Sequence, residues 1–113
     1  MFESVTTITL DDLLPLIKTD RAFIKADVQG TEIRIFNERT AGKFFDSVHV
    51  PFVLMEWDFY RPEWSDPVRK KKIDDWLEFF YKRNYVPYCD VTFQRHAPDW
   101  SKWGANVLFR LHT

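Results

Sequence analysis

The sequence is poor in cysteine and glycine, and neither sign of charge is in excess. Of its 113 residues, one is cysteine and three are glycine, and the formal net charge is -1. The single Cys89 cannot form an intramolecular disulfide or supply a cysteine-rich zinc site. The near-neutral charge provides no general attraction to nucleic acid or to an anionic membrane. We therefore expect no nucleic-acid partner and no membrane partner.

Long apolar runs and targeting signals are also absent from the sequence. No run approaches the length of a membrane-spanning helix. The start, MFESVTTITLDDLL, has no basic segment followed by an apolar block, so it does not read as a secretory signal. A length of 113 residues is typical of one small domain. We expect a single soluble domain over residues 1–113, located in the cytoplasm.

Aromatic residues are abundant, and the apolar runs predict strands. Phe, Trp and Tyr make up 18% of the chain. Residues 22–28 and 50–57 are almost continuously apolar, which is typical of parallel strands covered on both faces. Residues 5–10 alternate more weakly and are β-branched, which predicts a short strand or an extended lead-in.

Helix signals lie between and after these runs. Asp66 followed by Pro67 predicts the start of a long helix that ends near Asn84. A short helix is expected from Asp11 or Asp12 to residue 17. A further helix is expected to start at Thr31 and to break near Gly42.

The last part of the chain predicts a hairpin. Residues 85–91 and 106–111 resemble strands, with no helix between them, and Pro87 favours an edge position for the first. The order of elements therefore predicts an α/β fold, with parallel strands followed by a C-terminal antiparallel hairpin.

Acidic side chains stand where the two clearest strands end. Asp27 lies at the end of the first, and Glu56 and Asp58 lie at the end of the second. If the strands are parallel neighbours, the three carboxylates converge on one rim, where sheets of this kind bind ligands. Such a cluster can act as a base, a hydrogen-bond acceptor or a hard-metal site. Alternatively, these carboxylates only cap the helices that follow.

Two residues near Asp27, Lys25 and Gly30, are further candidates for the site. Lys25 lies two residues earlier, on the same face of the strand, and could neutralise a buried carboxylate; alternatively it reaches solvent along its aliphatic stem. Gly30 allows a sharp turn and a close approach of the backbone to a ligand.

The segment WDFYRPEW, residues 57–64, follows the second strand and is rich in aromatic residues. Trp57, Tyr60, Arg61 and Trp64 either frame a substrate or pack over the rim of the sheet, and the packing alternative is favoured for the tryptophans. Arg61 is the better candidate for a polar contact, because guanidinium groups suit carboxylate or phosphate.

The segments TLDDLL, FIKADVQGTE and VLMEWD resemble the carboxyl-terminal half of the FkbM-type methyltransferases, which use S-adenosylmethionine to methylate hydroxyl groups. The family pattern is an L-D-x-L stretch, a strand with K-x-D-x-x-G-x-E, a helix, and a strand that ends in an acidic residue. The residues that match it are Leu10, Asp11, Asp12, Leu13, Lys25, Asp27, Gly30, Glu32 and Glu56.

The resemblance implies a partial Rossmann-like sheet. Residues 22–28 would be strand four of a seven-stranded methyltransferase sheet and residues 50–57 strand five. The hairpin would be strands six and seven, with the seventh antiparallel and inserted between five and six. Catalytic roles would fall to Asp27 and then Glu56. The cleft would be lined by Lys25, Gly30, Glu32, Trp57, Asp58 and Arg61, and we assign no metal ligands.

The sequence departs from the family pattern in the part that would bind the cofactor. In this fold the methyl donor is held mainly by the first three strands, with a glycine-rich turn. This sequence has no G-x-G and nothing upstream that could form those strands. The chain would be a fragment, a half-domain that pairs with another polypeptide, or a protein that has lost catalysis. We expect it not to bind S-adenosylmethionine usefully by itself.

Two functions from different classes are favoured, and a small nucleic-acid-binding α/β domain is a third, weaker alternative. The first is methyl transfer to a hydroxyl of a small molecule or glycan, with this chain inactive alone. The second is a non-catalytic protein-interaction module. In both, the strand at residues 22–28 would be an exposed edge, which predicts self-association through that strand or poor solubility.

Overall fold

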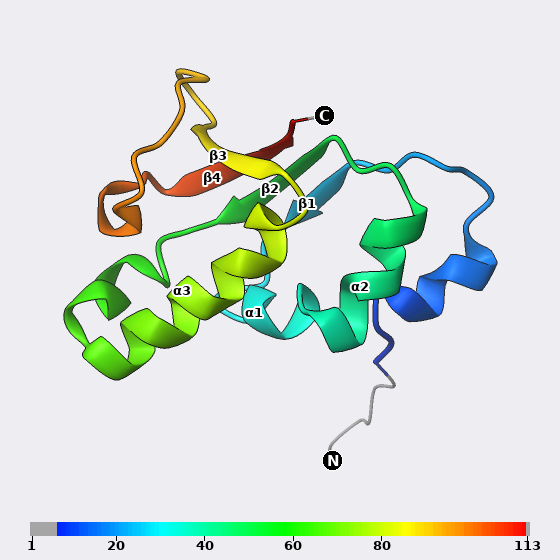
Figure 1. Cartoon of the computed structure of the whole chain (residues 1–113), viewed down its shortest axis with the longest axis horizontal. Helices are drawn as coiled ribbons and strands as arrows, with labels where there is room; N and C mark the ends of the chain where they lie inside the picture. The colour runs from blue at the N-terminus through cyan, green and yellow to red at the C-terminus, as the bar shows by residue number, and fades with distance from the viewer. Residues whose placement is uncertain (1–6, 113) are drawn as a thin grey trace, which may run out of the picture.

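The computed structural model describes residues 7–112, which form a four-stranded mixed sheet with helices on one of its faces (Figure 1). The strands are β1 (Ile24–Ala26), β2 (Phe52–Glu56), β3 (Tyr85–Cys89) and β4 (Asn106–Leu111). The α-helices are α1 (Glu32–Ile35), α2 (Glu38–Ser47) and α3 (Pro67–Tyr81). Short 3-10 helices are η1 (Asp11–Leu16), η2 (Arg61–Ser65) and η3 (Trp100–Lys102). None of the helices in this range is long and apolar enough to cross a membrane.

The order of the strands in the sheet is β1-β2-β4-β3. β1 and β2 are parallel, whereas β4 is antiparallel to both of its neighbours, β2 and β3. The predicted parallel pair and C-terminal antiparallel hairpin are therefore confirmed, and the final strand lies between β2 and β3. Pro87 is in the edge strand β3, as expected of a residue that has no N–H to donate.

The long helix starts and ends at the predicted signals. The side chain of Asp66 accepts hydrogen bonds from the backbone N–H groups of Val68 and Arg69, at 3.0 and 3.3 Å, so it is the N-cap of α3. After the helix, Asn84 takes a left-handed conformation with φ 69°, which turns the chain into β3.

Two local predictions were wrong. The strand expected at residues 22–28 is only three residues long. Of the two alternatives for residues 5–10, a strand is not found at residues 7–10, and residues 5 and 6 lie outside the described residues. The helical break is at Asn37 and not at Gly42, because the Asn37 side chain accepts from the N–H groups of Arg39 and Thr40 and starts a new helix there.

The core lies between the sheet and the helices and is largely aromatic. Val53 and Met55 of β2 and Val107 and Phe109 of β4 point into it and are almost fully buried. The ring of Phe109 stacks on Phe80 of α3, with 4.4 Å between ring centres. Burial of this apolar surface is the main force that holds the helices on the sheet.

The opposite face of the sheet is open in the described part of the chain. Phe52 and Leu54 of β2 and Leu108 of β4 are only partly buried there. They line a shallow groove of about 580 Å³ together with Phe23 and Phe93, which are 61% and 69% exposed.

Candidate functional site

The carboxyl ends of β1 and β2 bring two carboxyl groups together. Asp27 directly follows β1, and Glu56 is the last residue of β2. The strands are parallel, and Ala26 is paired with Met55, so the next residues along each strand are Asp27 and Glu56. The pKa of the Glu56 carboxyl is raised, first by a hydrogen bond with Asp27, then by burial and by the negative charges of Asp27 and Glu32. A carboxyl group with a raised pKa accepts protons more readily than an ordinary one.

A third carboxyl group, Glu32, lies in the protein interior at the start of α1. Its side chain is fully buried. The Oε2 atom accepts a hydrogen bond from the Gly30 N–H at 3.1 Å and from the Tyr60 hydroxyl at 2.9 Å. Oε1 has no hydrogen-bond partner among the described residues. Burial raises the pKa of the Tyr60 phenol, and the charge of Glu32 and this hydrogen bond add to that effect.

The turn between β1 and α1 needs its glycine. Gln29 and Gly30 both have positive φ, 51° and 91°. A side-chain carbon placed on Gly30 would lie 3.4 Å from the ring of Phe59. Gly30 therefore supplies the left-handed conformation of the turn and donates its N–H to Glu32.

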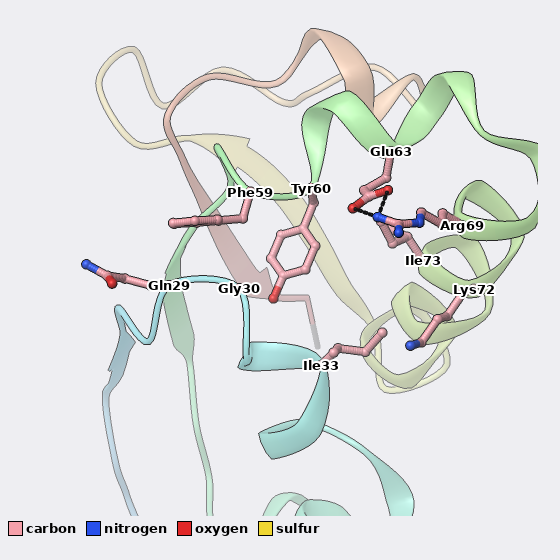
Figure 2. Close-up of a pocket in the computed structure, with 9 residues that line it drawn as sticks. All are labelled: Gln29, Gly30, Ile33, Phe59, Tyr60, Glu63, Arg69, Lys72 and Ile73. Carbon is pink, nitrogen blue, oxygen red and sulfur yellow. Dashed lines mark hydrogen bonds and ion pairs between the residues drawn. The ribbon is translucent and has the colours of Figure 1, made fainter.

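A pocket of about 360 Å³ lies beside this turn (Figure 2). It is lined by Gln29, Gly30, Ile33, Phe59, Tyr60, Glu63, Arg69, Lys72 and Ile73. In Figure 2 the Tyr60 ring lies between Phe59 and the ion pair of Glu63 with Arg69. Arg69 donates to both oxygens of Glu63, at 3.0 and 3.1 Å. Lys72 adds a second positive charge to this wall.

The other predicted site residues lie elsewhere. Lys25 is exposed, and no ion pair joins it to Asp27 within residues 7–112. Asp58 forms an ion pair with Arg61, so it is turned to that guanidinium. In this same part of the chain, no group of three or more histidine, cysteine or acidic side chains is placed to hold a metal ion.

Trp57 is part of the core. It is fully buried, and its indole Nε1 donates to the backbone carbonyl of Trp100 at 2.8 Å. Its ring contacts those of Tyr60, Trp76 and Trp103, with ring centres 4.8–6.0 Å apart. Of the two alternatives for Trp57, framing a substrate or packing against the sheet, the structure therefore shows packing.

The arrangement belongs to a broad class of α/β proteins. In that class, polar groups gather at the carboxyl ends of parallel strands, and ligands bind there. A comparison with known families gives a narrower assignment. The profile of the methyltransferase FkbM domain matches residues 3–87, and the chain belongs to that family. Members of this family generally depend on S-adenosylmethionine. No curated protein and no solved structure gives a significant match.

Proposed function

We propose that this chain carries the acceptor side of an FkbM-type O-methyltransferase. In this proposal Asp27 and Glu56 bind the hydroxyl group to be methylated, and one of them accepts its proton. The observation that supports it most is the approach of the two carboxyl groups, which raises the pKa of Glu56. A positioned base of this kind makes a hydroxyl oxygen more nucleophilic in the reaction. The acceptor would be a small molecule or a glycan.

The neighbouring pocket supports the acceptor assignment. Its walls combine the apolar side chains of Ile33 and Phe59 with the polar Tyr60 and the cationic Arg69 and Lys72. Small-molecule sites combine apolar walls with polar groups that fix orientation, and polar and apolar side chains share the lining of this pocket. We place the body of the acceptor here, beside the turn that follows Asp27.

The residues of this chain do not fit the methyl donor, and we propose that the chain by itself is inactive. The sequence has three glycines. Gly42 lies inside α2 and Gly104 in the loop before β4, while Gly30 is a single glycine in a turn that lies against Phe59. None of them opens a glycine-rich turn of the kind that lets a backbone approach a nucleoside cofactor. We therefore derive no step that involves the donor.

A second candidate function is a non-catalytic interaction module. The open apolar face of the sheet favours it, because Phe23 and Phe93 expose more than half of their surface there. Exposed patches of this kind mark surfaces where proteins associate.

The carboxyl pair can be tested by titrating Glu56. We expect NMR to give a pKa for Glu56 above the ordinary value of about 4.3, because hydrogen bonding and negative charge from Asp27 favour its protonated form. In Asp27→Asn the negative charge is gone and the amide can donate to Glu56, so the pKa of Glu56 falls toward the ordinary value.

Asp58→Asn is the matched control for this titration. Asp58 also follows β2, but it is paired with Arg61 and does not contribute to the shift of Glu56. The control therefore leaves the pKa of Glu56 unchanged. An ordinary or lowered pKa for Glu56 in the unmodified chain would remove the support for a base at this position.

A further inference from the structure

The two edges of the sheet differ in whether their backbone N–H and C=O groups have hydrogen-bond partners. At the β3 edge, the Cys89 N–H donates to the Gln94 carbonyl at 2.8 Å, and the Pro87 carbonyl accepts from His96 at 2.9 Å. A bridge between Tyr88 and Arg95 covers the same edge. At the other edge, β1 pairs only with β2 in the part of the chain that the structure describes. An uncovered edge of this kind is a template for pairing with another strand.

The charges on this edge strand are arranged to complement a second copy of themselves. Lys25 and Asp27 flank Ala26, and both charged side chains are exposed. Neither takes part in an ion pair with the described residues of its own chain. In an antiparallel pair of two such strands centred on Ala26, each Lys25 lies directly opposite the Asp27 of the other copy. Opposite charges in directly opposed positions stabilise a strand pair.

The registers centred on the two charged residues themselves are less favourable. Centring the pair on Lys25 opposes two lysines, and centring it on Asp27 opposes two aspartates, both of which are destabilising. In the register centred on Ala26, Ile24 lies opposite Val28, which is 39% exposed in the single chain. The ladder ends after Val28, because Gln29 has a positive φ of 51° and leaves the extended conformation.

We propose that two copies of this chain associate through antiparallel pairing of their β1 strands, centred on Ala26. The two sheets then become one continuous sheet, and Lys25 of each copy contacts Asp27 of the other. The second copy thereby contributes a lysine to the carboxyl pair of Asp27 and Glu56. This inference is independent of the proposed methyltransferase role.

Exchanging the charges of Lys25 and Asp27 tests the proposal. Analytical ultracentrifugation of the whole 113-residue chain measures the association. We expect a dimer whose dissociation constant rises about tenfold or more in Lys25→Asp and in Asp27→Lys, because each change opposes like charges twice. The double variant, Lys25→Asp with Asp27→Lys, restores opposite charges and returns the dissociation constant to within about threefold of the original. Circular dichroism of each variant shows whether it is folded.

Arg110→Glu is the matched control, since Arg110 is exposed on β4 and borders the open apolar face. It leaves the dimer unchanged if pairing is through β1. A monomer at all concentrations, or a double variant as weak as the single ones, would overturn the proposal. So would loss of the dimer in Arg110→Glu or in Phe93→Ser, which would place the interface on the open face.

Discussion

Replacing Trp57 by alanine lowers the free energy of unfolding by about 3–5 kcal/mol, as expected for a large buried aromatic residue. The side chain is fully buried beneath the loop that follows β2. Its ring is 4.8 Å from that of Trp103 and stacks on Trp76, with ring centres 6.0 Å apart. The change leaves a cavity and also leaves the Trp100 carbonyl without its hydrogen-bond donor. Urea unfolding followed by circular dichroism measures the loss.

Phe59→Ala is the control for this measurement. Phe59 belongs to the same loop, but it is 47% exposed, so its truncation costs less than about 1 kcal/mol. If Trp57→Ala were as stable as this control, Trp57 would not be a core residue, and its assignment to a ligand cleft would regain support.

Replacing Glu32 by alanine lowers the free energy of unfolding by about 2–4 kcal/mol. The carboxyl group accepts from the Gly30 N–H and the Tyr60 hydroxyl. Alanine leaves the buried Tyr60 hydroxyl and the partly buried Gly30 N–H without their acceptor, and a buried donor without a partner costs free energy. The same denaturant experiment measures this loss.

Glu32→Gln separates the hydrogen bonds from the charge. The amide oxygen of glutamine can accept from the same two donors. We therefore expect a change of less than about 1.5 kcal/mol in the free energy of unfolding, because the acceptor is kept and only the charge is removed. An alanine variant no less stable than the glutamine variant would show that these two hydrogen bonds do not hold the turn.

Much of the fold could be predicted because its signals are local. Asp66 and Pro67 mark the start of α3 within a single turn, and Asn84 marks the left-handed residue after it. Pro87 indicated an edge strand because it cannot donate in a ladder. The break at Asn37 was missed because asparagine and glycine both interrupt helices. Only the packed structure shows that a side-chain carbon at position 42 would meet Glu38, at 2.8 Å from Oε2.

The site could be predicted in part. The approach of Asp27 to Glu56 follows from two parallel strands in register, so strand ends in the sequence were sufficient to suggest it. The pocket could not be anticipated, because it depends on contacts between distant segments. Its lining comes from the turn at Gly30, from η2 with Glu63, and from α3 with Lys72, which are far apart in the sequence.

The central proposal is that this chain binds an acceptor but does not bind the methyl donor by itself. Isothermal titration calorimetry of the whole chain with S-adenosylmethionine tests this most directly. We expect no binding heat at ligand concentrations up to about 1 mM, which is the weak end of the affinity scale. A saturable titration with a micromolar dissociation constant would contradict the proposal and show that this chain contains a donor site of its own.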